Sequence, residues 1–259
     1  IGIGTQSFRI VMHFFDVKNE VTDVIEIIPT DREQTGITEA RLDDVSKHLI
    51  FCVDDSDGSI KKLVLEIFNC AAHKLCYITI PIKTQFTISP SLHKELVLVK
   101  PSIPQFLKLS AITTYIPGET AYEYGVLMIE ELLNISISYY SVVPQRVYDT
   151  VFATEITDRE AKTGENPQKT YPREIFSPDF LEFLHTIKTE TQLRNYIKEI
   201  YSEIYSNLPL EDKLYYMESY LNTPGENISF EVIAGEDSNS AYTVDEAAAE
   251  NQLKACMAE

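Results

Sequence analysis

Two short apolar runs joined by a very short connection restrict the fold of this chain more than any other stretch. Residues 63–68 and 75–80 are rich in β-branched and aromatic side chains, which predicts strands buried on at least one face. The five residues between Cys70 and Cys76 are too few for a crossover helix, so we expect an antiparallel hairpin. Pro81 then ends the second strand, and we expect the loop after it to carry functional groups.

Composition limits the partners that such a sheet can have. The chain has 259 residues, of which 44% are hydrophobic, so it can build a real core. Its formal net charge of −18 argues against nucleic acid and anionic lipid as general partners, because a phosphate backbone is bound by neutralising it with Lys and Arg. No run approaches the roughly 18 apolar residues of a membrane-spanning helix.

The order of the other elements predicts an α/β fold, in which a central mixed β-sheet is flanked by helices. A helix over residues 120–133 leads directly into a strand over 135–143, which is typical of a mixed or parallel sheet. We expect an N-terminal extension with a β-hairpin over residues 1–45, followed by one domain over 46–259. The other expected strands cover 7–28 (as two strands), 48–53, 96–99 and 228–233. The other expected helices cover 177–187, 193–208, 210–221 and 245–257. We expect residues 85–104 to be otherwise irregular and residues 154–173 to form a long loop, an excursion from the domain.

An acidic turn follows the strand at 48–53. Residues 54–58 read Asp-Asp-Ser-Asp-Gly, which suits a solvated hairpin turn. The alternative is a metal-facing carboxylate at Asp54, because α/β sheets tend to bind ligands where buried strands end. Cys70, His73 and Cys76 offer too few ligands for a zinc site. Cys70 and Cys76 are either two separately buried thiols or a pair facing each other across the hairpin.

Catalytic motifs give little further guidance. The sequence has no glycine-rich phosphate loop, no His-Glu-x-x-His and no Gly-x-Ser-x-Gly elbow. The five histidines are isolated in the sequence, and we expect each to be a packed or surface side chain rather than a base. Residue types alone therefore indicate an acidic mixed α/β domain and no particular reaction.

Order and spacing resemble the LytR–CpsA–Psr family of bacterial envelope proteins. That family usually reads Leu-Leu-Leu-Gly-x-Asp, then Arg-Ser-Asp before a hairpin, then Ser-Ile-Pro-Arg-Asp-Thr. The corresponding stretches here are 49–54 (Leu-Ile-Phe-Cys-Val-Asp), 59–61 (Ser-Ile-Lys) and 79–84 (Thr-Ile-Pro-Ile-Lys-Thr), and residues 128–140, 230–236 and 241–245 resemble later family segments. The resemblance spans about residues 46 to 250, by architecture more than by identity.

The resemblance implies a location and a mechanism. Family members are anchored by an N-terminal membrane helix with the domain outside the cell, and the present sequence begins at Ile1 rather than Met, so we expect such an anchor to be absent from this chain. They bind a polyprenyl-pyrophosphate glycan in an apolar channel and transfer the glycopolymer to peptidoglycan, with Mg²⁺ and several arginines. Arginine suits this role because its guanidinium grips pyrophosphate oxygens bidentately.

The family's charged positions are largely replaced in this chain. Ile82 and Lys83 stand where the Arg-Asp pair would be, and Lys61 stands at the second aspartate. In the later Asp-x-x-Arg-x-x-Arg-Gln motif, Arg194 is retained and Lys198 stands at the glutamine. Lys61, Lys83, Arg194 and Lys198 either converge into a weaker anion site or are unrelated surface cations.

Three hypotheses follow from these departures. The first is a divergent envelope protein that binds polyprenyl-(pyro)phosphate-linked glycan or a cell-wall partner, such as peptidoglycan or a protein, with transferase activity weak or lost. The second is an active phosphotransferase with a rearranged site, in which Asp54 holds Mg²⁺ while Lys83 and Arg194 bind pyrophosphate. The third is a non-enzymatic extracellular interaction module that shares only the layered architecture.

Overall fold

The computed structural model describes residues 37–151 and 188–258. The strands expected over 7–28, the excursion over 154–173 and the helix over 177–187 lie outside these residues. The division after residue 45 stays a prediction. Among the described residues, no helix combines the length and apolar character needed to cross a membrane.

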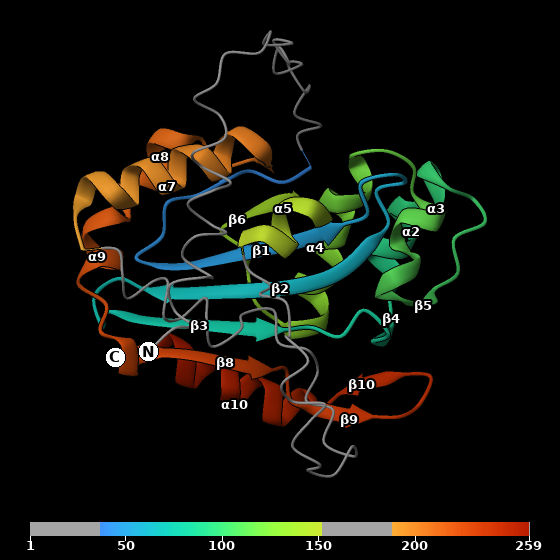
Figure 1. Cartoon of the computed structure of the whole chain (residues 1–259). Coiled ribbons are helices and arrows are strands. Elements are labelled where there is room, and N and C mark those ends of the chain that lie inside the picture. Colours follow the sequence, from blue (N-terminus) through green and yellow to red (C-terminus); the bar gives the residue numbers. More distant parts are fainter. Residues whose placement is uncertain (1–36, 152–187, 259) are drawn as a thin grey trace, which may run out of the picture.

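A mixed sheet of six strands forms the centre of the described structure, in the order β7-β6-β1-β2-β3-β8 (Figure 1). β1, β2 and β3 are consecutive antiparallel strands, whereas β6 is parallel to β1 and β8 is parallel to β3. The hairpin at 63–80 and the central mixed sheet are therefore confirmed. The strands are β1 (Val45–Val53), β2 (Ile60–Asn69), β3 (Lys74–Thr79), β6 (Tyr139–Pro144), β7 (Tyr205–Ser206) and β8 (Ile228–Val232), with small two-stranded ribbons formed by β4 (Gln85–Thr87) and β5 (Phe106–Lys108) and by β9 (Gly235–Asp237) and β10 (Tyr242–Val244).

Helices cover the two faces of this sheet. α4 and α10 pack on one face, and α7, α8 and α9 lie over the other, where α5 also packs (Figure 1). The helices are α2 (Pro90–Val99), α3 (Ile112–Tyr115), α4 (Thr120–Leu133), α5 (Gln145–Val151), α7 (Glu190–Glu203), α8 (Leu210–Tyr215), α9 (Met217–Leu221) and α10 (Glu246–Met257), with 3₁₀ turns η2 (Leu109–Ala111) and η4 (Gly225–Asn227).

Strict alternation along the central strands divides the core in two. In β1, Leu49 and Phe51 point to the α4 face, and Ile50 and Cys52 point to the α7 face. Successive side chains of a strand lie on opposite faces, so strands that are apolar throughout can bury both. This explains why residues 63–68 are an almost unbroken apolar run rather than an alternating one.

The α4 face is closely packed. Phe51 is fully buried, and its ring centroid lies 5.5 Å from that of Tyr122 and 6.1 Å from that of Tyr140. Gly125 allows this approach, because a Cβ there would lie 3.1 Å from the Phe51 ring. α4 has the bounds expected from the sequence, and it ends at Asn134 in the left-handed conformation with φ of 50°.

Four local expectations were wrong. The helix expected over 193–208 ends at Glu203, and residues 205–206 within that range form strand β7. The strand expected at 96–99 is part of helix α2, which begins after Ser89 with Pro90 in its first turn. Ser followed by Pro is a typical start of a helix, because Ser caps the first turn and Pro fits the first helical position. The strand expected from residue 135 begins only at Tyr139, and the helix expected over 210–221 is divided at Tyr216 into α8 and α9.

Cys70 and Cys76 are separate thiols and do not face each other across the hairpin. Cys70 is half-buried in the turn after β2, and Cys76 is buried in β3 beside Cys256 of α10. The hydrogen bond from Cys256 lowers the pKa of the Cys76 thiol to about 7, against the opposing effect of burial. The neighbour of Cys76 is thus on the C-terminal helix and not across the turn.

Candidate functional site

A cavity of about 290 Å³ lies between the sheet and helices α7, α8 and α9. We call it the α7 cavity. Aliphatic and tyrosine side chains from both layers make up most of its wall. The aliphatic lining includes Ile50 and Val143 from the sheet and Leu193, Ile197, Ile200 and Ile204 from the segment of α7.

Polar side chains form the sheet side of this cavity. Glu66 of β2 and His48 of β1 are direct cross-strand partners, and Ser141 of β6 lies beside Ile50 of β1 in the parallel pairing. Glu66, His48 and Ser141 therefore point to the same face from three adjacent strands, and all line the cavity. Each is less than 8% exposed.

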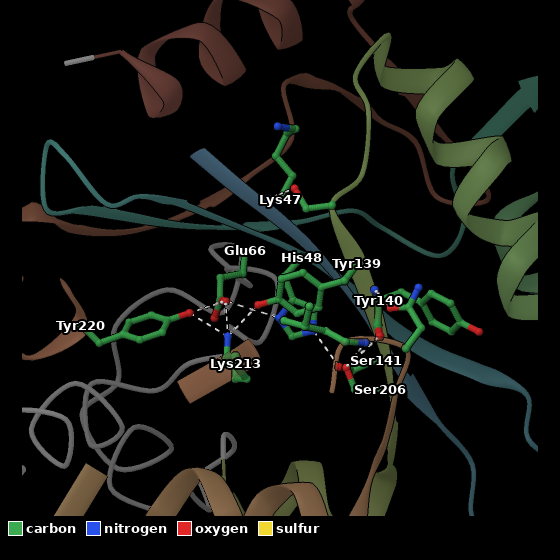
Figure 2. A network of polar contacts seen from close by, with 12 residues as sticks. Lys47, His48, Glu66, Tyr139, Tyr140, Ser141, Ser206, Lys213 and Tyr220 are labelled. Atoms are coloured by element: carbon green, nitrogen blue, oxygen red, sulfur yellow. Dashed lines mark hydrogen bonds and ion pairs between the residues drawn. The ribbon is translucent and has the colours of Figure 1, made fainter. Parts of the chain in front are cut away.

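Lys213 of α8 reaches down onto this row. Its Nζ lies 3.2 Å from Glu66 Oε1 and donates hydrogen bonds of 2.7 Å to the hydroxyls of Tyr139 and Tyr220 (Figure 2). The Tyr220 hydroxyl donates in turn to Glu66 Oε1 at 3.0 Å. All three ammonium donors are therefore satisfied inside an apolar layer, which is the condition under which a buried ion pair is tolerated.

The network holds Glu66 in its charged form. Burial alone would raise the pKa of this carboxyl, but the Lys213 ammonium and the hydrogen bonds from His48 and Tyr220 outweigh it, and the pKa lies well below its usual value. Burial raises the pKa of Tyr139 and Tyr220 well above 10, with the Glu66 charge adding to the effect. Both phenols are therefore neutral hydrogen-bonding groups at any ordinary pH.

His48 sits between Glu66 and Ser141 (Figure 2). Its Nδ1 lies 3.3 Å from Glu66 Oε1, its Nε2 lies 2.8 Å from Ser141 Oγ, and its ring stacks on Tyr139 with centroids 4.1 Å apart. Burial lowers its pKa to about 4 even though the Glu66 hydrogen bond and charge oppose the shift. The imidazole is thus neutral at neutral pH.

Known proteins share this fold without close similarity in sequence. No family model matches the chain, and no curated protein matches its sequence. Solved structures do match: B. subtilis TagV has a TM-score of 0.56 at 11% identity, over 83% of this chain and 98% of that chain. TagT bound to LI-WTA has a TM-score of 0.50 at 13% identity, over 87% and 96%. The protein gbs0355 of Streptococcus agalactiae has a TM-score of 0.55 at 13% identity, over 82% and 87%.

TagV and TagT are LytR–CpsA–Psr proteins. The chain has a LytR–CpsA–Psr-like fold. The family resemblance drawn from residues 46 to 250 is confirmed for the fold. Sequence identities of 11–13% show a shared fold but not a shared function.

Within this LytR–CpsA–Psr-like domain, the predicted cations do not share one site. Lys61 lies 3.3 Å from Asp54 at the β1–β2 turn, whereas Lys83 pairs with Asp237 of β9. Arg194 pairs with Glu190 one turn earlier on α7 at 2.9 Å, and Lys198 is exposed on the same helix. Ile82, at the position of the family's arginine, packs against the α4-face core and does not line the α7 cavity.

Both carboxylate oxygens of Asp54, the residue expected to hold Mg²⁺, are engaged by neighbouring side chains. Its Oδ1 accepts hydrogen bonds from the backbone N–H and the hydroxyl of Ser56, and its Oδ2 faces Lys61. The Ser56 hydrogen bonds and then Lys61 lower its pKa to about 2. Among the described residues, no three His, Cys, Asp or Glu side chains are gathered as metal ligands. With both oxygens engaged, Asp54 fits the solvated hairpin turn better than a metal site.

Sequence reasoning missed the residues that the structure brings together. Glu66 stands in the middle of the apolar run 63–68, and a charged side chain in a strand buried on both faces needs a buried partner. That signal was available. The identity of the partner was not, because Lys213 follows Glu66 by 147 residues and looks like an ordinary helix cation.

Proposed function

We propose that this chain binds the lipid part of a polyprenyl-(pyro)phosphate-linked glycan at the outer face of the cell membrane. The observation that supports this most directly is the α7 cavity, a largely apolar space between the central sheet and its covering helices. An apolar chain entering it would exchange water for the side chains of Ile197 and Ile200, which is favourable in proportion to the apolar area removed from water.

The fold supports the same class of ligand. TagT, which has this fold, is described as bound to LI-WTA, a wall teichoic acid compound. In this chain the equivalent role is a glycopolymer-related one in the cell envelope, and the cavity supplies a place for the lipid.

The size of the cavity sets how much of a polyprenyl chain it holds. A methylene group occupies about the volume of a liquid water molecule, ~30 Å³, so 290 Å³ corresponds to roughly ten carbon atoms. Two isoprene units fill such a space. We infer that the described cavity accommodates a segment of the tail and not its full length.

The distribution of charge favours binding over transfer. Lys61, Lys83 and Arg194 each face a carboxylate of their own, so none presents an uncompensated charge to a pyrophosphate. Loss of one charge-stabilising donor typically costs on the order of 10²–10³ in rate. We therefore propose that transferase activity is weak or lost.

Binding of a short, water-soluble polyprenyl phosphate, such as geranylgeranyl phosphate, tests the proposal by titration calorimetry. The variant Ile200→Phe fills the cavity and should weaken binding at least tenfold. The matched control is Leu98→Phe, which adds the same ring on α2 at a side chain that is 84% exposed. Binding that is absent, or that is equally strong in both variants, would contradict the proposal.

A transfer assay separates this proposal from an active enzyme. Labelled glycan would be offered with isolated peptidoglycan and Mg²⁺, and we expect no transfer above the rate without protein. Turnover that disappears in Asp54→Ala would instead establish the phosphotransferase with a rearranged site. Failure of both binding and transfer would favour the non-enzymatic interaction module.

A further inference from the structure

A serine, a histidine and a carboxylate form a continuous chain along the sheet side of the α7 cavity. Ser141 Oγ lies 2.8 Å from His48 Nε2, and His48 Nδ1 lies 3.3 Å from Glu66 Oε1 (Figure 2). The order is that of a nucleophile, its base and the group that orients the base. Three adjacent strands hold the three side chains, so their spacing is fixed by the sheet.

The proton positions follow from the chemistry of the partners. Glu66 is charged and can only accept, so His48 carries its hydrogen on Nδ1. His48 Nε2 is then an acceptor, and the Ser141 hydroxyl donates to it. This is the tautomer that a general base needs, because the free nitrogen faces the hydroxyl that is to lose a proton.

We propose that Ser141 is a nucleophile that cleaves a carboxylic ester whose apolar acyl chain occupies the α7 cavity. Ser141 Oγ bonds to the ester carbonyl carbon as His48 Nε2 takes the hydroxyl proton. The bond from that carbon to the alcohol oxygen then breaks, and the imidazolium gives the proton to the departing alcohol. Water repeats the attack with His48 as base, which releases the carboxylic acid and restores the Ser141 hydroxyl.

The surroundings of the three residues favour an apolar ester over a charged one. Glu66 and Lys213 neutralise each other beneath the cavity, and the other charged residue of the lining, Lys188, is exposed to solvent. The cavity's aliphatic wall matches an acyl chain of about eight to ten carbons by volume. Burial first of all raises the pKa of Tyr201 to about 12, so this lining phenol remains a hydrogen-bond donor for a carbonyl oxygen at neutral pH.

Glu66 acts here as a positioning residue. It holds the His48 ring through Nδ1, while Lys213 and Tyr220 hold the carboxylate in place. Glu66 also forms an ion pair with Lys213, so it is not bound to His48 alone as the carboxylate of a simple Ser-His-acid triad would be. Glu66→Gln should lower the maximal rate of ester cleavage more than it raises the KM, because the substrate contacts the wall and Ser141 rather than Glu66.

An alkyl fluorophosphonate probe tests the nucleophile directly on the unmodified protein. We expect one equivalent of probe on Ser141, located by mass spectrometry of the digested protein. A serine that only satisfies a buried histidine does not react with such a probe. Absence of label from the native protein, or label on a different residue, would overturn the proposal without reliance on any variant.

Hydrolysis of p-nitrophenyl octanoate supplies the second readout. Ser141→Ala and His48→Gln should each lose at least about 100-fold in kcat/KM. The matched control is Ser206→Ala, because Ser206 is the cross-strand partner of Ser141 on β7 and contacts the Tyr140 carbonyl instead of His48. An equal loss in the control would also overturn the proposal.

The two proposals for this cavity fail separately. Geranylgeranyl phosphate binding that persists in Ser141→Ala, together with lost labelling, supports both. Binding without labelling of the native protein supports lipid binding alone, and labelling without binding supports the esterase alone.

Discussion

The two faces of the central sheet are packed differently, although the same strands form both. The α4 face is filled: Phe51 lies against Tyr122 and Tyr140, and Gly125 brings the covering helix onto its ring. The α7 face leaves a cavity and places an ion pair and a histidine beneath it. Because close packing supplies stability and open space supplies binding, we assign stability mainly to the first face and function to the second.

Truncation of one large side chain on each face gives the largest expected contrast. Phe51→Ala should lower the free energy of unfolding by about 3–5 kcal/mol, because it creates a new cavity in a filled core. Ile200→Ala enlarges a space that already exists and should cost about 1 kcal/mol. Urea denaturation of both variants measures the difference. Equal losses would show that the α7 face is packed as closely as the other.

Removal of one partner of the buried ion pair should have an effect of similar size. Lys213→Met leaves the Glu66 charge without its counterion, which typically costs about 3–5 kcal/mol. The double variant Glu66→Leu with Lys213→Met removes both charges and should be more stable than Lys213→Met alone. A double variant that loses the sum of the two single losses would mean that the pair is not coupled.

Acid should weaken the α7 face through His48. Its pKa is lowered to about 4 in the folded state from 6.5, so the unfolded chain binds the proton more readily. The contribution is fully present above pH 6.5 and is lost as the pH falls from 6.5 to 4, by up to about 3 kcal/mol. Urea midpoints between pH 7 and pH 5 measure this slope.

His48→Gln is the variant that should flatten the slope, because glutamine does not titrate in this range. His93→Gln is the matched control, since His93 lies on α2 away from the α7 cavity and contacts the Ile103 carbonyl. A slope that survives in His48→Gln would assign the acid sensitivity to other groups.

The smallest effects are expected at the surface pairs formed by two of the predicted cations. Lys83→Ala and Arg194→Ala each remove an ion pair with side chains that are 34% and 41% exposed, and each should cost less than about 1 kcal/mol. The same urea titrations measure them. A loss above 2 kcal/mol at either position would show a buried role that their present contacts do not indicate.

The local parts of the fold were readable from the sequence. The hairpin of β2 and β3, the bounds of α4 and the helix after Asp245 follow from periodicity, turn length and capping residues within a few positions of each element. Helix α2 was missed although Ser89 and Pro90 announce it, because scattered prolines in residues 85–104 suggested an irregular chain.

The candidate site was not readable in the same way. His48, Glu66 and Ser141 come together because β6 inserts beside β1 as a parallel strand, and that neighbour relation follows from the whole topology. The pairing of Lys61 with Asp54 was missed as well, although only six residues separate them across one turn. Local elements were therefore predicted, whereas the contacts between their charged side chains were not.

The parallel pairing of β3 with β8 also has a consequence for biosynthesis. Leu75 finds its partner Ile228 only after the roughly 150 residues between them have also left the ribosome. Until then β3 is an uncovered edge with unpaired backbone groups and apolar side chains, which is the kind of surface on which nascent chains aggregate. Such distant contacts also slow folding, so this domain should reach its native state late and benefit from a chaperone that shields β3.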